Sequence, residues 1–205
     1  MNVCDVLIVG GGPVGSYLAA KLAKNSVSVI LIDKKKEVGK KACSGLVSTR
    51  INDFISLDSG LILNRIKGAK FNSANSSFDL LDSKVRAYVV DRVKFDQSLL
   101  RSAVSKGVRF FGDTCYKSHE NCDEGVVVAT DNGFFKCKVV VGADGAGSQV
   151  RMNAGLCRGM KQVNGIIGHF DIDGAQSDYV ELFYDKSIVK DFFAWKIPRG
   201  NDVEI

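Results

Sequence analysis

The sequence predicts an α/β fold with additional α+β elements: a mixed sheet with helices, followed by the start of a β-rich section. Three features of the 205 residues indicate this fold class. Two β-branched runs with a helical pattern between them occupy residues 3–32. Short alternating runs separated by Ser and Asn turns occupy residues 64–81. After Asn164 the pattern is again mainly that of strands.

The first three elements follow one another directly. Residues 3–9 form an apolar run that ends in glycines, which is typical of a buried strand. Residues 14–24 show helical spacing of apolar residues, and residues 27–32 form a second buried run that ends before Asp33. A strand, a helix and a strand in about thirty residues predict parallel pairing, and therefore a Rossmann-type unit.

The middle of the chain alternates between strands and one strong helix. An antiparallel hairpin is expected within residues 64–81. A helix is expected over residues 95–106, where Phe95, Leu99 and Ala103 recur at helical spacing. Other short strands are expected at residues 85–92, 108–111, 125–129, 133–137, 139–141, 165–172, 178–184 and 192–197.

Composition excludes several classes of protein. A net charge of +5 is too small to indicate a nucleic-acid partner. Five of the nine residues 33–41 are lysine, which indicates a solvated loop, with a phosphate-facing or anionic-membrane-facing edge as the alternative. The six cysteines form no CxxC pair, so no metal site is expected. Without a secretory signal or a membrane-length apolar run, we expect a cytoplasmic chain with reduced thiols.

A glycine-rich loop joins the first strand to the first helix. Gly10, Gly12 and Gly15 form G-x-G-x-x-G, in which the glycines permit a tight turn, close approach of a pyrophosphate and close packing of the helix. The start of the helix offers free N–H groups to phosphates. Asp33, 23 residues after Gly10, stands where this fold binds a ribose hydroxyl, and an acid there disfavours a 2′-phosphate. The loop therefore predicts FAD or NAD, with Val14 and Lys34 counted among the cofactor-binding residues.

Two later segments carry charged residues at the ends of predicted strands. In "VVDRVKFDQSLL", Arg92 stands at a helix start, where it can pair with an anionic group; an ordinary surface arginine is the alternative. In "VVVGADGAGSQVR", Asp144 lies between glycines. It can accept hydrogen bonds from a sugar or ribityl hydroxyl, or shape the nearby pyrophosphate loop, and a solvated turn aspartate is the alternative.

These segments, in this order and spacing, resemble the FAD-dependent oxidoreductases of the p-hydroxybenzoate hydroxylase fold. Within that group the chain is most similar to the geranylgeranyl reductase family, including the archaeal digeranylgeranylglycerophospholipid reductases. The segments "VGGGPVGS", "DRVKFDQSLL" and "VGADGAGSQVR" belong to the wider flavoprotein group. The segments "GKKACSGLVS" and "FFAWKIPRG" favour the reductases, although Ile197 stands where the family usually has Phe.

The resemblance implies FAD as the cofactor and assigns its contacts. They fall on Gly15, Asp33, Cys43, Ser44 and Arg92, with a backbone contact near Tyr116. Asp144 and Gly145 match the Asp-Gly segment of the hydroxylase-like enzymes, and Gly45 follows Ser44 in a form of the Cys43 motif that is one residue shorter than usual.

Cys43 itself has three interpretations. A metal ligand lacks partner spacing, and a buried packing cysteine is the plain alternative. The third is a thiol beside the flavin, because small residues and an expected helix over residues 46–55 follow it, and a helix N-terminus lowers a thiol pKa. The resemblance places this position at the isoalloxazine ring.

The resemblance also implies a reaction: reduction of isolated C=C bonds in the geranylgeranyl chains of isoprenoid lipids. Cys43 would then position or gate the flavin, or pass a proton. Phe192, Phe193, Trp195 and Ile197 would line the lipid path, although alternation along a strand places half of such residues in the core in any case. The implied partners are an isoprenoid lipid and an electron donor, NAD(P)H or ferredoxin, with the protein peripheral to the membrane.

The expected domains are an FAD-binding domain over residues 1–160, with an antiparallel insertion at about residues 60–90, and an incomplete β-rich substrate domain over residues 161–205. Proteins of the family continue into a second Gly-Asp segment that contacts the flavin, so a C-terminally truncated chain is expected. Two further functions stay open: an FAD-dependent aromatic hydroxylase, and a non-catalytic module that binds FAD or ADP.

Overall fold

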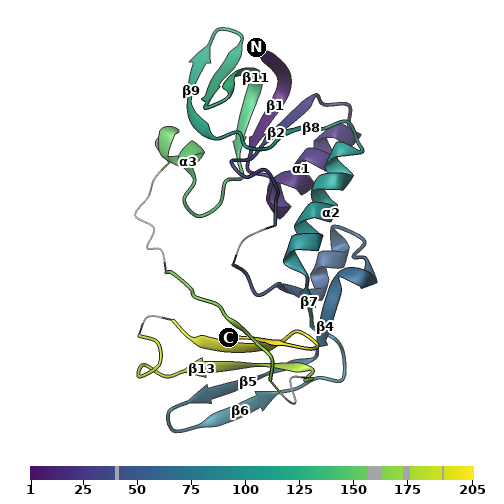
Figure 1. Ribbon diagram of the computed structural model, residues 1–205, viewed down its shortest axis with the longest axis vertical. Coiled ribbons are helices and arrows are strands. Elements are labelled where there is room, and N and C mark those ends of the chain that lie inside the picture. Colours follow the sequence, from purple (N-terminus) through teal and green to yellow (C-terminus); the bar gives the residue numbers. More distant parts are fainter. Residues whose placement is uncertain (40–41, 157–162, 173–175, 191) are drawn as a thin grey trace. The chain divides into compact units, whose positions relative to one another are not determined.

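The chain divides into two compact units (Figure 1). Unit 1 comprises residues 1–40 and 93–162, and unit 2 comprises residues 41–92 and 163–205. The computed structural model describes residues 1–39, 42–156, 163–172, 176–190 and 192–205.

Unit 1 is built on a mixed sheet, whose described strands follow the order β8-β2-β1-β11-β10-β9. These strands are β1 (Asn2–Val9), β2 (Val29–Ile32), β8 (Arg109–Phe111), β9 (Tyr116–Cys122), β10 (Gly125–Thr130) and β11 (Gly133–Gly142). β1 pairs in parallel with β2 and β11, and β2 pairs in parallel with β8. β10 pairs antiparallel with both β9 and β11. The predicted mixed sheet is confirmed, and β11 unites two strands that were expected separately at residues 133–137 and 139–141.

Helices cover both faces of this sheet. α1 (Pro13–Lys24) and α2 (Arg92–Val104) contribute to the core on one face, where Ala19 lies with Ile8 (Figure 1). Pro13 suits the first turn of α1, because an N–H there has no partner within the helix. α3 (Gln149–Asn153) contributes Val150 to the core on the other face, which includes Leu7. Leu7 and Ile8 alternate along β1, so one strand supplies both cores.

Two thiols in the core of unit 1 respond to pH. Cys4 and Cys137 are buried neighbours across β1 and β11. Burial raises the pKa of the Cys4 thiol from its ordinary 9.0 to about 11, and burial also raises the pKa of the Cys137 thiol. The folded state therefore favours the neutral thiol, and this stabilisation is complete below pH 9 and is lost as the pH rises towards 11.

We therefore expect the urea concentration at the unfolding midpoint to fall as the pH is raised from 9 to 11, and to fall less in Cys4→Val. Valine keeps a buried apolar side chain and cannot ionise. Unfolding curves followed by circular dichroism across this range measure the effect. An equal loss in the parent and in Cys4→Val would contradict the assignment to this thiol.

Unit 2 contains two sheets among its described residues. The smaller has the order β3-β7-β4 and consists of β3 (Leu46–Ser48), β4 (Ile62–Ile66) and β7 (Ala87–Val90). The larger has the order β12-β15-β14-β13-β5-β6 and consists of β5 (Gly68–Ser73), β6 (Ser77–Leu80), β12 (His169–Phe170), β13 (Tyr179–Tyr184), β14 (Ala194–Pro198) and β15 (Val203–Glu204). Two 3-10 helices, Thr49–Asp53 and Ser59–Leu61, complete the described elements. β5 and β6 form the antiparallel hairpin expected within residues 64–81, and β5 also pairs in parallel with β13.

One face of the larger sheet is apolar and aromatic. Phe78, Phe71, Leu182 and Trp195 lie directly opposite one another across β6, β5, β13 and β14. Directly opposed residues share a face of the sheet. The rings of Phe71 and Phe78 stack with centroids 4.6 Å apart. We call these four residues the apolar ladder.

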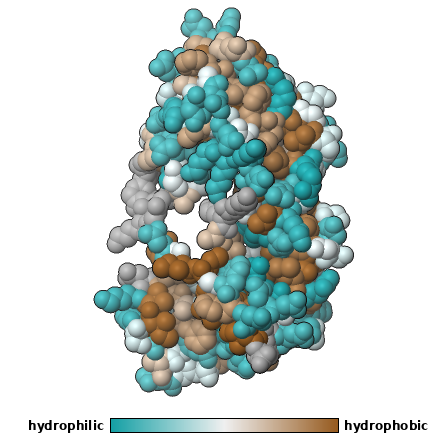
Figure 2. Space-filling view, viewed as in Figure 1, coloured by the Kyte–Doolittle hydropathy of each residue, from teal (hydrophilic) through white to brown (hydrophobic). Residues whose placement is uncertain are grey.

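The opposite face of the same sheet is charged. One position along each strand from the apolar ladder, Asp79, Lys70, Glu181 and Lys196 also lie opposite one another. Lys196 pairs with Glu181 at 2.9 Å, and Lys70 with Asp79 at 3.9 Å. Figure 2 shows apolar and hydrophilic side chains gathered in separate groups on the surface of this unit. The sheet is therefore amphipathic, with period-2 alternation on four neighbouring strands.

The smaller sheet packs on part of the apolar face. Ile66 of β4 and Val89 of β7 form a buried core with Val180 of β13 and Ile197 of β14. Trp195 is half-buried against this core. The apolar face is therefore covered near Ile197, while Phe78 at the far end of the ladder is exposed.

One expected element is wrong. Residues 46–55 were expected to form a helix after Cys43, but Leu46–Ser48 is strand β3 and Thr49–Asp53 is a 3-10 helix. Leu46 pairs with Val89, so ladder hydrogen bonds to β7 replace the helical ones. Cys157, Lys40, Lys41 and the expected domain boundary at residue 160 lie outside the described residues. The expected domain ranges stay a prediction.

Candidate functional site

The three glycines of the G-x-G-x-x-G motif each have a distinct geometric role. Gly10 has a φ of 109°, and a Cβ there would lie 2.4 Å from the Ala143 carbonyl oxygen. A Cβ on Gly15 would lie 1.9 Å from the Gly10 carbonyl oxygen. A Cβ on Gly12 would meet no described atom within 4 Å. The first glycine thus permits the turn, the third permits close packing of α1, and the second leaves open space beside the backbone.

The N-terminus of α1 is suited to an anion. Gly12 is the N-cap, its extended backbone carries no side-chain cap, and the first turn contains no acidic residue. Val14 is exposed in this turn. The first N–H groups of a helix lack partners within the helix and lie at the positive end of its dipole. Together with the open space at Gly12, this cradle fits the pyrophosphate of a dinucleotide.

Asp33 directly follows β2 and lies beside this loop. Its Oδ2 accepts a hydrogen bond from the Gly11 N–H at 2.7 Å, and its Oδ1 accepts one from the Lys35 N–H at 2.8 Å. Lys34 is exposed next to it. The carboxylate thus fixes the loop on one side and the turn after β2 on the other, which is the position from which a ribose hydroxyl is bound in this fold.

The Asp144 segment shapes the same loop from β11. The Asp144 carboxylate accepts hydrogen bonds from the Ser148 hydroxyl at 2.5 Å and the Gln149 N–H at 2.7 Å, so it binds both the N-cap residue and the first N–H of α3. Gly145 has a φ of 85°, which favours glycine. The backbone of residues 143–144 is what a Cβ on Gly10 would strike. Of the two functional interpretations of Asp144, this geometry favours the one in which the segment shapes the pyrophosphate loop.

Tyr116 begins β9, and its ring belongs to the core of unit 1. The hydroxyl accepts a hydrogen bond from Asn153 Nδ2 at 3.2 Å and contacts the His119 ring. Burial raises the pKa of this phenol above its usual value. The predicted cofactor contact uses the backbone of Tyr116, and it stays a prediction.

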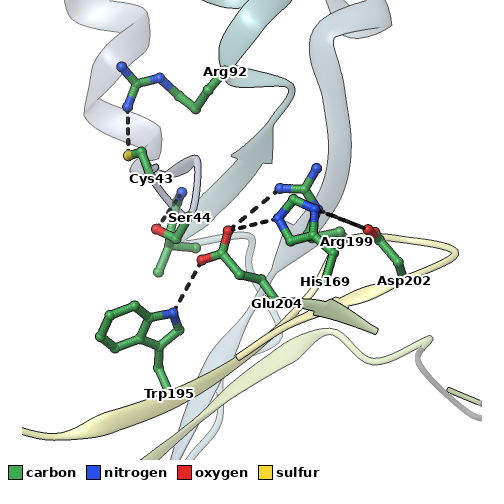
Figure 3. Close-up of polar contacts among 9 residues, drawn as sticks. Cys43, Ser44, Arg92, His169, Trp195, Arg199, Asp202 and Glu204 are labelled. Atoms are coloured by element: carbon green, nitrogen blue, oxygen red, sulfur yellow. Dashed lines mark hydrogen bonds and ion pairs between the residues drawn. The ribbon is translucent and has the colours of Figure 1, made fainter. Parts of the chain in front are cut away.

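The Cys43 segment belongs to unit 2, where it is held by β7 and Arg92. Gly45 has a φ of 72°, and its carbonyl accepts a hydrogen bond from the Val90 N–H at 2.9 Å. A Cβ on Gly45 would lie 2.3 Å from the Val90 carbonyl oxygen. The Arg92 guanidinium donates to Cys43 Sγ at 2.7 Å (Figure 3). Because the expected helix is replaced by β3, this guanidinium, and not a helix N-terminus, is the cationic group at the thiol.

Ser44 stabilises the same turn by accepting a hydrogen bond from the Leu46 N–H at 3.3 Å. Cys43, Ser44 and Arg92 are each half-buried. The structure thus brings these three predicted residues together within unit 2, while the glycine loop, Asp33, Tyr116 and Asp144 lie in unit 1.

The predicted substrate-lining residues alternate along one strand and its approach. Trp195 belongs to the apolar ladder, and the Phe193 ring lies 6.2 Å from it, edge to face. Phe192 stacks on Phe193 at 4.2 Å and is exposed. Ile197 is buried in the core of unit 2. Of these four residues, Ile197 is the one whose environment favours a packing role over a place on the lipid path.

Sequence reasoning missed two groups of residues in unit 2. Phe71 and Tyr184 join Phe193 and Trp195 in a row of rings that we call the aromatic row. The Tyr184 ring stacks 6.4 Å from that of Phe71 and lies 5.2 Å from that of Phe193. Glu204 is fully buried at the Trp195 indole. Alternation within β13 is a signal for Tyr184, but nothing in the run "DVEI" distinguishes a buried glutamate from an exposed one.

Across the described ranges, no group of three or more His, Cys, Asp or Glu side chains is arranged to hold a metal ion. A helix both long and apolar enough to span a bilayer is likewise not found in the part of the chain that the structure describes.

The fold of unit 1 and its glycine loop define a dinucleotide-binding protein. The family model described as "FAD binding domain" matches residues 3–193, and the chain belongs to this family. The predicted cofactor, FAD, is confirmed by this match.

Individual relatives show which members of this family the chain resembles. The digeranylgeranylglycerophospholipid reductase of Methanothrix thermoacetophila is 27% identical over 211 residues, which cover 96% of this chain and 54% of the relative. A crystal structure of a geranylgeranyl bacteriochlorophyll reductase-like protein from Thermoplasma acidophilum matches with a TM-score of 0.86 and 28% identity, over 100% of this chain and 56% of that one. A halogenase solved with FAD shares the fold, with a TM-score of 0.71 at 17% identity, over 98% of this chain and 51% of that one.

The predicted kinship with geranylgeranyl reductase-like flavoproteins is therefore confirmed. The chain spans about half the length of the digeranylgeranylglycerophospholipid reductases that it matches.

Proposed function

We propose that this chain is the N-terminal portion of an FAD-dependent reductase of isolated C=C bonds in the geranylgeranyl chains of isoprenoid lipids. One observation carries the proposal. The two segments that favour reductases over hydroxylases, around Cys43 and Trp195, are about 150 residues apart in sequence and belong to the same compact unit.

The two segments are connected through β7. Gly45, two residues after Cys43, is hydrogen-bonded to Val90. The adjacent Val89 is packed in one core with Ile197, and Trp195 packs against that core. A rigid connection of this kind supports a shared task, because a cofactor-facing group and a substrate wall must keep their spacing within a fraction of an ångström.

The apolar ladder supports the substrate class. A linear isoprenoid offers no hydrogen-bonding groups along its chain, so recognition must come from apolar and aromatic contact area. Phe71, Phe193 and Trp195 offer this aromatic contact area on one face of the sheet, while the opposite face is charged. An aromatic hydroxylase would instead need polar groups that orient a phenolic substrate.

We assign the site residues accordingly. The loop residues and their acid take the adenosine and pyrophosphate part of FAD: Gly10, Gly12, Val14, Gly15, Asp33 and Lys34. The flavin end is taken by Cys43, Ser44, Gly45 and Arg92. Tyr116, Asp144 and Gly145 support the cofactor through the backbone.

FAD, when bound in its reduced form, supplies a hydride to one alkene carbon, and a proton from water or an acid completes the saturated bond. The protein's own part is to orient and exclude water. Arg92 holds Cys43 in place, and the aromatic row aligns the chain and keeps water from the alkene. We propose NAD(P)H or a ferredoxin as the electron donor and a location peripheral to the membrane.

Substitution of Cys43 with alanine tests this function. We expect Cys43→Ala to lower the turnover of a geranylgeranyl glycerophospholipid by about tenfold, the factor that a lost hydrogen bond to a charged donor represents. Mass spectrometry of the lipid counts the hydrogens gained by the parent and by the variant. Cys122→Ala, which alters an exposed cysteine of unit 1, is the matched control and is expected to retain parental turnover.

One outcome would contradict the role of Cys43, and two would contradict the proposed reaction. Equal turnover in Cys43→Ala and the parent would remove Cys43 from the site. Gain of oxygen by an aromatic substrate, with no lipid reduction, would indicate the hydroxylase. Bound FAD without turnover of either substrate, even with NAD(P)H and ferredoxin supplied, would indicate a binding module.

A further inference from the structure

Glu204 is a fully buried acid on the apolar side of the larger sheet of unit 2. The residue is 0% exposed. It lies directly opposite Ile197 of β14 and opposite His169 of β12. Trp195 is two residues before Ile197, so its side chain is on the same face. A carboxylate in this place is costly unless its oxygens are paired, and an apolar residue would fit the surrounding core without that cost.

Both carboxylate oxygens of Glu204 contact polar side chains (Figure 3). Oε1 accepts a hydrogen bond from Trp195 Nε1 at 3.2 Å. Oε2 lies 3.3 Å from His169 Nε2 and 3.7 Å from Arg199 Nη1. Arg199 is itself held by Asp202, with Nε 3.2 Å from Oδ1. One oxygen thus faces the Arg199 guanidinium and the His169 ring, and the other is directed to the indole.

Two roles can be weighed for this acid. A proton donor must touch the alkene or a water beside it, and a side chain with no exposed surface, whose oxygens face an indole and a guanidinium, does not meet that requirement. A positioning residue needs only to hold another group. The contact with Trp195 Nε1 meets that requirement, because the indole N–H of a half-buried tryptophan needs an acceptor, and a carboxylate is a strong one.

We propose that Glu204 is a positioning residue that fixes the Trp195 indole on the apolar face, so that the ring is a rigid wall for the isoprenoid chain. Arg199 is the counter-charge that lets Glu204 stay buried, and the His169 ring is a further polar partner of the same oxygen. The part that concerns the isoprenoid rests on the proposed function. The part that concerns Trp195 stands on the geometry of unit 2 alone.

The chain contains one tryptophan, so Trp195 reports on itself. We compare Glu204→Leu, which removes the acceptor at similar size, with Glu204→Gln, which keeps an oxygen for the indole. Glu181→Gln is the matched control, because Glu181 is a strand carboxylate of the same sheet, paired with Lys196 on the charged face. Fluorescence emission and quenching by acrylamide are measured on each protein without substrate.

We expect the quenching constant of Trp195 to rise about twofold or more in Glu204→Leu, and to remain near the parental value in Glu204→Gln and Glu181→Gln, because a freed ring samples more exposed rotamers. With FAD and lipid, kcat/KM is expected to fall about tenfold in Glu204→Leu and to be largely retained in Glu204→Gln. Rescue by glutamine is the result that a merely structural carboxylate would not give, since glutamine lacks the charge that pairs with Arg199.

The parent protein supplies an independent test in case Glu204→Leu does not fold. The indole N–H of Trp195 gives one nitrogen-correlated NMR signal, and we expect its hydrogen exchange to be roughly tenfold or more slower than in the urea-unfolded chain. Exchange at the unfolded rate, or a folded Glu204→Leu with parental quenching, would overturn the positioning role. Slow exchange and increased quenching in a protein that leaves the lipid unchanged would uphold the Trp195 contact and refute the proposed substrate.

Discussion

Gly15→Ala is expected to abolish FAD binding and to lower the stability of unit 1 by roughly 3 kcal/mol, the upper range for an overpacked site. The added methyl would lie 1.9 Å from the Gly10 carbonyl oxygen, which is backbone and has no rotamer to adopt. Relief requires α1 to move away from β1, which opens the turn that forms the anion cradle. Thermal unfolding and titration with FAD, followed by quenching of flavin fluorescence, measure both losses.

Gly12→Ala separates cofactor binding from folding. A methyl there meets no described atom within 4 Å, and the Gly12 backbone, with φ −66° and ψ −178°, suits alanine. Stability should therefore change by less than about 0.5 kcal/mol, as for an unstrained surface site. FAD affinity should nevertheless fall about tenfold or more, because the methyl occupies the space through which the pyrophosphate approaches. Parental affinity in Gly12→Ala would show that the pyrophosphate binds elsewhere.

Arg92→Met is expected to lower lipid turnover by about tenfold to a hundredfold, the range for losing a hydrogen bond from a charged group. The Arg92 guanidinium holds Cys43 Sγ at 2.7 Å, and methionine keeps an unbranched side chain but lacks the guanidinium donor. Arg92→Lys should restore little, because an ammonium lacks the planar fork of a guanidinium. Steady-state kinetics with the reduced lipid quantified by mass spectrometry give the comparison.

A second readout for Arg92→Met does not depend on turnover. The rate at which Cys43 is alkylated, followed by peptide mass spectrometry, should differ from the parental rate in Arg92→Met. It should equal the parental rate in Arg101→Met, which changes an arginine in the last turn of the same helix. Parental kinetics together with parental alkylation in Arg92→Met would show that the contact with Cys43 has no functional weight.

Local signals in the sequence predicted unit 1 well. The glycine loop, β1, α1, β2 and Asp33 all lie within residues 2–33, and their backbone requirements leave few alternatives. Arg92 and Cys43, 49 residues apart, were both selected from the sequence, but their mutual contact was not, because spacing alone does not reveal which loop a helix start meets.

Pairing between segments that are distant in sequence limited what could be predicted of unit 2. Residues 46–55 were expected to be helical because no local signal reports the ladder between Leu46 and Val89. Tyr179 of β13 pairs with Gly68 of β5, 111 residues earlier, and this pairing alone aligns Phe71 with Leu182. Glu204 was missed for a different reason: nothing local shows that the turn between β14 and β15 brings it to Trp195 and Arg199, or that β12 supplies His169.

One measurement tests the central proposal most directly. The FAD-loaded protein is reduced under anaerobic conditions and mixed with a geranylgeranyl glycerophospholipid, while the visible absorbance of the flavin is followed. We predict that oxidised flavin returns in the absence of oxygen, and that one double bond is saturated for each flavin reoxidised. Flavin that stays reduced until oxygen is admitted, with the lipid unchanged, would contradict the assignment of this chain to a reductase of isoprenoid double bonds.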